Sequence, residues 1–262
     1  MGALSVPLLL CLIAVTYGFP ETEIVGGKDA PVGMFPYQVS IRRRGVHLCG
    51  GSIINSRYIL TAAQCAQGLG DIRNISINAG TVLFNGTGVS YEIDRVVVHR
   101  NYTVATNTND IALIRVNRNI LFNNLIKPIP LANGNYSYEG ASCFLTGWGK
   151  LSLGGSNPRV LQYVNLTVEN QWRCKQKFSN VINSHICTSS NYGKGACVGD
   201  NGSPLVSNGV QIGIASFGRP CAGGYPDVYT RVSSFDFWIK QQQFNMRKGE
   251  VDEPPSDAIY IA

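Results

Sequence analysis

Short segments in which apolar and polar residues alternate recur along much of this chain. Tyr37-Val39-Ile41, Ile75-Ile77, Val164-Leu166-Val168 and Val210-Ile212-Ile214 each place alternate apolar side chains on one face. Turn residues separate these segments, and a period of two is typical of strands with one buried face. The pattern therefore predicts an all-β fold, either a sandwich or a barrel, and does not choose between the two.

Two local signals add detail to the C-terminal half. Asn208-Gly209 stands between the apolar runs 205–206 and 210–215, and both turn residues tolerate positive φ, so we expect a β-hairpin there. Near the end, Ser233 is a candidate N-cap with Asp236 three residues later, and aromatic and apolar residues follow. This pattern predicts one C-terminal helix.

The N-terminus has the composition of an export signal. Residues 6–15 form an apolar run that is too short to span a bilayer, and small or neutral residues follow as far as Gly18. We therefore expect a signal peptide at 1–18 and a short propeptide at 19–23. The protein is expected to be secreted and extracellular, and not an integral membrane protein.

Charge is distributed unevenly. Residues 249–262 contain four acids, no bases and a Pro-Pro pair, which predicts an acidic mobile tail at 247–262. The whole chain has a formal charge of +6, so the remainder is distinctly basic. Its densest basic run, Arg42-Arg43-Arg44, is either a solvated hairpin tip or a site for heparin-like glycans or anionic membranes. No nucleic-acid-binding motif is present, so we expect no nucleic acid partner.

Cysteines and glycosylation patterns agree with export. Of the eight cysteines, Cys11 leaves with the signal peptide, so seven remain and at least one is free or pairs between chains. Spacing alone does not assign the partners. Asn-x-Ser/Thr patterns predict glycosylation at Asn74, Asn85, Asn101, Asn135 and Asn165.

Six motifs occur in one order along the chain. They are Ile24-Val25-Gly26-Gly27, Leu60-Thr61-Ala62-Ala63-Gln64-Cys65, Asp110-Ile111-Ala112-Leu113, Gly147-Trp148-Gly149, Gly199-Asp200-Asn201-Gly202-Ser203-Pro204 and Pro226-Asp227-Val228-Tyr229. Over about residues 24 to 243 the chain resembles the chymotrypsin-like serine peptidases, particularly the insect enzymes. The resemblance implies two six-stranded antiparallel β-barrels with a cleft between them and a C-terminal helix. It places this domain at 24–246, with the boundary between barrels near 125–130.

Two positions depart from the family's catalytic pattern. Gln64 stands where the family has histidine and Asn201 where it has serine, whereas Asp110 matches the aspartate. An amide does not titrate near neutral pH and its nitrogen lone pair is delocalised, so neither residue suits a base or a nucleophile. We therefore expect the chain not to be an enzyme. The backbone amides of Gly199 and Asn201 match the oxyanion hole, and Ser203 replaces a family glycine.

The three histidines do not restore the missing base. His47, His99 and His185 all lie outside the TAAxC segment, so we expect structural or surface roles for them. Asn201 also begins a glycosylation pattern, but Pro204 follows it and the family places this loop in the cleft, so no glycan is expected there.

The resemblance also implies how the chain is activated. Family precursors are cut just before the first motif, here between Glu23 and Ile24. The new amine of Ile24 would then pair with the buried Asp200, and His47 is an alternative partner before cleavage.

The specificity pocket follows from the same resemblance. Its residues are Gly195, Ser216, Phe217, Gly218 and Asp227. Asp227 would meet a basic group or be covered over, and an extended peptide would add as a strand along Ser216 and Gly218.

Disulfide pairs are likewise implied. Cys49 pairs with Cys65, Cys174 with Cys187, and Cys197 with Cys221. Cys143 is left over, because Ser207 stands where the family has its partner. It is either a buried, inert free thiol or an intermolecular bridge.

Three functions are open at this point. The first is a secreted serine protease homologue that binds a peptide or protein in its cleft without cleaving it, as a decoy, adaptor or cascade regulator. The second is a basic effector that binds anionic glycans or membranes, and the third is a weak serine-type endopeptidase, as fold analogy suggests. No cofactor or metal is expected for any of them.

Overall fold

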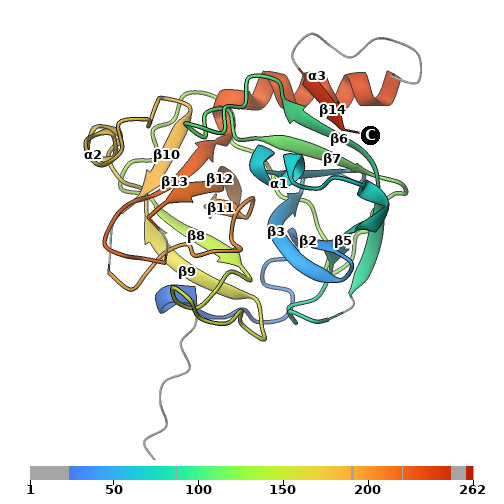
Figure 1. The fold of residues 1–262 in the computed structure, drawn as a ribbon, viewed down its shortest axis with the longest axis horizontal. Coiled ribbons are helices and arrows are strands. Elements are labelled where there is room, and N and C mark those ends of the chain that lie inside the picture. Colours follow the sequence, from blue (N-terminus) through green and yellow to red (C-terminus); the bar gives the residue numbers. More distant parts are fainter. Residues whose placement is uncertain (1–23, 87, 190–191, 220, 249–257, 262) are drawn as a thin grey trace, which may run out of the picture.

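The computed structural model describes residues 24–86, 88–189, 192–219, 221–248 and 258–261. The predicted signal peptide and propeptide, Glu23 included, lie outside the described residues. Figure 1 shows two β-sheet bodies side by side, with helix α3 (Asp236–Lys248) running across one end of both.

The first body is a closed barrel. Its strands are β2 (Gln38–Arg43), β3 (Val46–Ile53), β4 (Tyr58–Thr61), β5 (Ile75–Ala79), β6 (Val89–His99) and β7 (Ala112–Val116). Neighbours are antiparallel in the order β6-β5-β2-β3-β4-β7, and β6 pairs with β7 to close the ring. Ile41, Ile59 and Ile77 are fully buried in its core, so the strands expected from the alternating pattern are confirmed here.

The second body is an open sheet. Its order is β1 (Lys28–Asp29), β9 (Gln162–Thr167), β8 (Ser142–Gly147), β11 (Pro204–Ser207), β12 (Val210–Gly218), β13 (Asp227–Arg231) and β10 (His185–Thr188). A single bridge between Val168 and Thr188 joins the chain beyond β9 to the end of β10. Of the two expected six-stranded barrels, one is therefore present. The second does not close, because among the described residues the chain beyond β9 meets β10 at this one bridge, whereas β10 pairs with β13 along its whole length.

The expected hairpin and helix are both present. Asn208 and Gly209 connect β11 to β12 with φ of 48° and 74°, the positive values that this two-residue turn requires. Helix α3 begins at Asp236, after the 3₁₀ helix η3 (Val232–Phe235), so Ser233 lies within η3 instead of capping α3. Trp238 is buried against the core of the barrel and fixes α3 there.

The C-terminal region contains more regular structure than expected. Helix α3 continues to Lys248, and β14 (Ala258–Ile261) pairs antiparallel with 96–99 of β6. These stretches differ from the mobile tail predicted at 247–262. Strand β5 pairs with β6 only as far as Glu92, which leaves the backbone edge further along β6 open to another strand.

The remaining helices are short. They are η1 (Ile24–Gly26), α1 (Ala63–Gln67), η2 (Ile72–Asn74) and α2 (Gln171–Lys177). Residues 117–141 connect the two bodies, and the boundary predicted near 125–130 falls inside this connection and stays a prediction. Within the described ranges, no helix combines the length and apolar character needed to cross a membrane.

Candidate functional site

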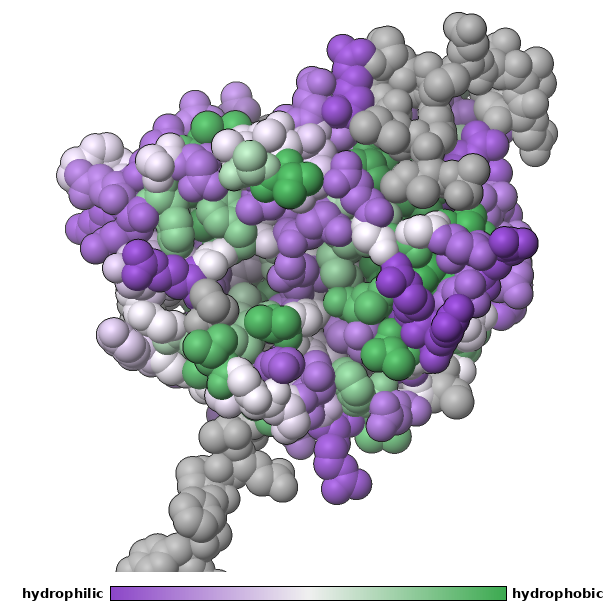
Figure 2. Space-filling view, in the orientation of Figure 1, coloured by the Kyte–Doolittle hydropathy of each residue, from purple (hydrophilic) through white to green (hydrophobic). Residues whose placement is uncertain are grey.

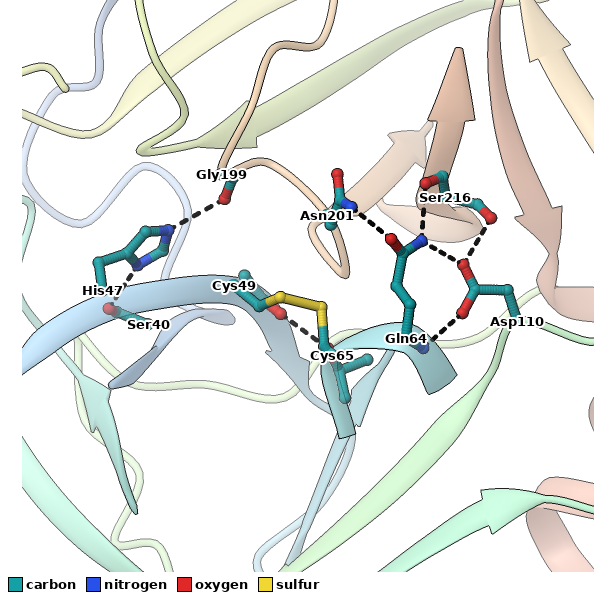
Figure 3. The surroundings of a disulfide bond; sticks show 11 residues. Ser40, His47, Cys49, Gln64, Cys65, Asp110, Gly199, Asn201 and Ser216 are labelled. Atoms are coloured by element: carbon teal, nitrogen blue, oxygen red, sulfur yellow. Dashed lines mark hydrogen bonds between the residues drawn. A yellow bond between two sulfur atoms is a disulfide. The ribbon is translucent and has the colours of Figure 1, made fainter. Parts of the chain in front are cut away.

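Helix α1 carries Gln64 to the junction of the two bodies. The helix directly follows β4 and has no side-chain cap at its start. Cys65 is joined to Cys49 of β3 by a disulfide, with 6.1 Å between the Cα atoms. This bond holds the short helix against the barrel, and Gln64 consequently points toward Asp110 and Asn201 (Figure 3).

Three side chains form a continuous hydrogen-bond chain. Asn201 Nδ2 donates to Gln64 Oε1 at 2.6 Å, and Gln64 Nε2 donates to Asp110 Oδ2 at 2.6 Å (Figure 3). Gln64 Nε2 also donates to the carbonyl oxygen of Ser216 at 2.7 Å, so both of its N–H groups and its oxygen are engaged. The direction of donation, toward the aspartate, is the direction in a serine–histidine–aspartate triad.

Asp110 anchors this chain from inside the protein. It is fully buried, and it also accepts hydrogen bonds from the Gln64 backbone N–H at 2.9 Å and from Ser216 Oγ at 2.6 Å. Burial raises the pKa of Asp110, and the hydrogen bonds from Ser216 and Gln64 oppose that rise. The carboxylate therefore fixes the carboxamide of Gln64 in one orientation.

The backbone amides expected at the oxyanion hole are available. Among the described residues, neither Gly199 N–H nor Asn201 N–H has a hydrogen-bond acceptor. The Gly199 carbonyl accepts a hydrogen bond from His47 Nε2 at 3.0 Å. Ser203 is buried with no partner for its hydroxyl, and it fits opposite Gly50, where a Cβ would stand 1.9 Å from Ser203 Oγ.

His47 supports this loop, and in the described part of the chain its ring nitrogens bond to Ser40 and Gly199 and not to Asp200. Because the Gly199 carbonyl only accepts, Nε2 carries the proton, and Nδ1 accepts from the Ser40 hydroxyl at 2.7 Å. Burial lowers the pKa of His47 to about 4, so the ring is neutral. The structure thus differs from the expectation that His47 pairs with Asp200 in the uncut chain.

Asp200 is satisfied by backbone donors instead. It is fully buried and accepts from Gly149 N–H at 2.8 Å and from Cys197 N–H at 2.9 Å. Burial raises its pKa to about 6. Its pairing with the amine of Ile24 after cleavage stays a prediction.

The predicted pocket residues do surround one cavity. Its volume is about 230 Å³, and its lining includes Ser216, Phe217, Gly218 and Asp227 as well as Gln64 and Asn201. Gly195 lies behind Asp227 with φ of 154°, and a Cβ there would stand 2.4 Å from Asp227 Oδ2. The disulfide between Cys197 and Cys221 ties the two walls together.

Asp227 lies deep in this pocket. It is 6% exposed, and its Oδ2 accepts a hydrogen bond from Ala196 N–H at 2.7 Å. Burial, and to a smaller extent the charge of Asp200, raises the pKa of Asp227 to about 7. The carboxyl group therefore changes charge near neutral pH, which is uncommon for aspartate.

Arg219 and Asn107 are among the pocket residues that the sequence analysis missed. Arg219 follows Gly218 directly, and its guanidinium lies over the ring of Tyr225, 3.7 Å from the centroid. A basic residue next to an expected pocket residue was the available signal. Asn107 reaches the cavity from a loop of the barrel, and nothing in the sequence pattern singled it out.

A free strand edge runs beside the pocket. Strand β12 pairs with β11 only as far as Ile214, while 217–218 pair with β13 on the opposite side. Within the residues that the structure describes, the backbone at Gly218 therefore has no strand partner on the side facing Gln64, whereas the Ser216 carbonyl on that side already accepts from Gln64 Nε2. This arrangement suits an added peptide strand.

The basic run does not form one exposed site. Arg42 is 5% exposed and donates to Ser40 Oγ, Gly86 O and Phe84 O. Arg43 is half-buried and donates to Leu69 O, which leaves Arg44 as the exposed member. The predicted patch at Arg42-Arg43-Arg44 is thus corrected: β2 turns Arg42 inward, where backbone carbonyls satisfy its guanidinium.

The implied disulfides are all present. Besides the two described above, Cys174 of α2 is bonded to Cys187 of β10. Cys143 is a buried free cysteine, and burial raises the pKa of its thiol to about 12. This pattern is consistent with an oxidising, extracellular environment.

The other predicted positions lie on the surface or in structural contacts. The five predicted glycosylation sites, Asn74, Asn85, Asn101, Asn135 and Asn165, are all exposed. His185 bonds to Asn107 O, and His99 packs against Phe235. Over the residues described here, no group of three or more His, Cys, Asp or Glu is arranged to hold a metal ion.

Comparison with known proteins places these features in a family. The model of the trypsin family matches residues 24–239. Over 220 residues the chain is 46% identical to chymotrypsin-2 of Vespa crabro, covering 84% of this chain and 100% of the relative. It is 40% identical to trypsin delta of Drosophila erecta over 225 residues, covering 84% and 88%, and 39% identical to trypsin alpha of Drosophila melanogaster, covering 84% and 87%.

These names correct one prediction and confirm another. The expectation that the chain is not an enzyme rested on two side chains, Gln64 and Asn201. It is overturned by relatives that are named as chymotrypsin and trypsin at up to 46% identity over 84% of the chain. The resemblance to chymotrypsin-like serine peptidases is confirmed by the same finding and by the match over 24–239. The chain therefore belongs to the trypsin family.

Proposed function

We propose that this protein binds an extended polypeptide segment in the cleft beside Gln64 and Asn201. The observation that carries the proposal is the backbone edge at Gly218, which has no strand partner on that side among the described residues, next to a pocket of about 230 Å³. A strand added there gains main-chain hydrogen bonds, and one of its side chains enters the pocket. The names of the relatives, which are peptidases, support the same class of ligand.

The pocket selects that side chain by charge as well as by shape. Asp227 lies at its depth, and the pKa of about 7 means that it is mainly neutral at pH 6 and mainly charged at pH 8. A lysine or arginine side chain gains from the charged form, and an apolar side chain from the neutral form. We therefore expect basic side chains to be preferred only above neutral pH.

Binding can be measured with labelled hexapeptides that differ at one central residue, lysine or leucine. Fluorescence polarisation at pH 6 and pH 8 should show micromolar binding, with the lysine peptide gaining several-fold at pH 8. Asp227→Asn should remove that gain, while Glu139→Gln, a change at an exposed carboxylate, should keep it. Absence of saturable binding at several hundred micromolar peptide would exclude the proposal.

Hydrolysis of the bound peptide is a second candidate, and the relatives named as chymotrypsin and trypsin favour it. The site offers two free oxyanion amides and an oriented hydrogen-bond chain, but amides stand in place of imidazole and hydroxyl. Mass spectrometry of the peptides recovered from the binding experiment measures turnover directly. A product whose formation rate follows the enzyme concentration and persists through repeated purification supports hydrolysis.

The proposal includes secretion and a role outside the cell. Three disulfides and five exposed glycosylation patterns support a secreted protein in which a bound segment is withheld from active relatives. Adding the purified protein to a related chymotrypsin should then slow cleavage of a peptide that both bind. Unchanged cleavage at saturating protein would contradict this role.

A further inference from the structure

A second cavity, of about 270 Å³, opens at the end of the second body that carries α2. None of its lining residues lines the peptide cleft. Gln171, Asn183, Arg231 and Ser234 contribute polar groups, and Tyr136 contributes an aromatic ring that is 70% exposed. The site is thus separate from the one described above and has a different chemistry.

Arg231 is the charged group of this cavity. Its Nε donates to Asn183 O at 3.1 Å, Nη2 to Gln171 Oε1 at 3.0 Å and Nη1 to Tyr136 O at 3.4 Å. These bonds use three of the five N–H groups of a guanidinium, and every acceptor is neutral. Within the described ranges, no carboxylate lies at ion-pair distance from Arg231, whereas Arg73, Arg115 and Arg173 each have one.

Partial burial makes this arrangement costly for the free protein. Removing the guanidinium from water lowers the pKa of Arg231, and neutral acceptors compensate a buried charge less well than an anion does. The guanidinium of Arg231 therefore lines the cavity with two N–H groups that remain available as donors and with a positive charge that no described carboxylate compensates. A sulfate or carboxylate group matches that donor geometry in a bidentate manner.

The surroundings extend the positive charge. Helix α2 carries Lys175 and Lys177 in its last turn, besides Arg173, which pairs with Glu169. Lys175 Nζ donates to the side chain of Asn183 at 2.9 Å, so a second cation stands next to a cavity residue. Hydrophilic residues gather over α2 at the left of Figure 2. An anion approaching this end of the molecule thus meets a favourable field.

The size and lining indicate more than a bare ion. The volume is several times the roughly 30 Å³ occupied by one water molecule, so there is room for a ring beside the anionic group. Amide and hydroxyl groups suit sugar hydroxyls, and the exposed ring of Tyr136 offers an apolar face for a pyranose. We propose that this cavity binds a sugar residue carrying a sulfate or carboxylate group, as found in acidic glycans.

The proposed glycan site is at Arg231 on the second body and not at Arg42-Arg43-Arg44, which was one of two interpretations of that basic run. It does not depend on the peptide cleft. The two functions can therefore fail independently, and each serves as the folding control for the other.

Calorimetric titration in 150 mM salt tests the proposal with four probes: a heparin tetrasaccharide, a hyaluronan tetrasaccharide, neutral chitotetraose and inorganic sulfate. Asn135 stands at the rim and begins a predicted glycosylation pattern, so enzymatically deglycosylated protein is used. We expect at least one acidic tetrasaccharide to bind at least tenfold more tightly than chitotetraose and sulfate. If only the heparin tetrasaccharide binds, the recognised group is a sulfate. If the hyaluronan tetrasaccharide binds as well, the site accepts either a sulfate or a carboxylate.

Variants locate the site. Arg231→Gln removes the positive charge and keeps a polar amide, and Ser234→Asp adds a negative charge at the exposed edge of the cavity. Each variant should weaken binding of the acidic sugar at least tenfold without affecting peptide binding. Arg44→Gln, an equal loss of charge on an exposed arginine of the barrel, should change it less than threefold. Equal losses in Arg44→Gln and Arg231→Gln would show diffuse attraction and overturn the proposal. The proposal would also be overturned if chitotetraose or inorganic sulfate bound as tightly as the acidic tetrasaccharides, or if none of the four probes bound.

Discussion

Replacement of Asp227 by asparagine should make the protein more stable at alkaline pH and leave it unchanged at acid pH. Burial raises the pKa of this carboxyl from 3.8 to about 7 in the folded protein. Between these two values the unfolded chain has released the proton and the folded protein still holds it. The wild type therefore loses stability as pH rises through this window, because its buried group must either keep a proton or become charged.

The size of the effect follows from the pKa difference. A rise from 3.8 to about 7 is about three pKa units, and each unit corresponds to about 1.4 kcal/mol. Asp227→Asn has no proton to release, and its side-chain oxygen can still accept from Ala196 N–H. The free energy of unfolding of the variant relative to the wild type should therefore increase by up to about 4 kcal/mol between pH 4 and pH 8.

Urea unfolding at half-unit intervals from pH 4 to pH 8.5 measures this difference. Asp110 is present in both proteins and its contribution to the pH dependence cancels, whereas Asp200, whose charge adds to the raised pKa of Asp227, contributes a smaller part of the difference. Glu139→Gln, on the surface, should show no comparable trend. A difference between Asp227→Asn and wild type that stays constant across this range would refute the assignment of the raised pKa to this residue.

Three further predictions concern the site, the free thiol and the barrel. The double variant Gln64→His with Asn201→Ser should have a kcat/KM for a chromogenic peptide about 10⁴-fold or more above that of either single variant, because these positions act as a unit. A correctly folded double variant with no such gain would contradict the geometry described for Asp110. Cys143 should resist thiol reagents in the native protein at pH 8 and react fully in urea, since burial raises its pKa to about 12. Rapid labelling of Cys143 in the native protein would argue against a buried thiol. Arg42→Ala should lower the free energy of unfolding by about 2 to 4 kcal/mol because it removes the donors to two partly buried carbonyls, whereas Arg44→Ala should change it by less than about 0.5 kcal/mol. Equal effects of the two variants in urea unfolding would place both arginines in solvent.

Much of the site was predictable because its residues lie in short local motifs. Gln64 and Asn201 could be identified from the TAAQC and GDNGSP segments, and the pocket residues were implied by the same family resemblance. The structure brings them together around Asp110, with donor–acceptor distances of 2.6 Å along the chain. What the side chains accomplish was judged from their identity alone, and the names of the relatives corrected that judgement.

Contacts between distant segments were not predictable in this way. Asn107 enters the pocket from the barrel, and His47 bonds to Gly199 across 152 positions of sequence. The burial of Arg42 depends on carbonyls of residues 84 and 86. A local pattern contains no information on such partners. A charged residue in a strand is predicted to be solvent-exposed, and only the position of the neighbouring loop shows that it is buried.

The sequence by itself determined the alternating strands, the Asn208-Gly209 hairpin, the family and the cysteine left without a partner. These features depend on periodicity, backbone preference and residue identity, which are properties of neighbouring positions. Only the tertiary structure decided that one barrel closes and the other sheet stays open, that Asp227 titrates near neutral pH, and that no described carboxylate lies at ion-pair distance from Arg231. Barrel closure, desolvation and ion pairing depend on which residues lie close together in space, and the order of residues along the chain does not specify those distances.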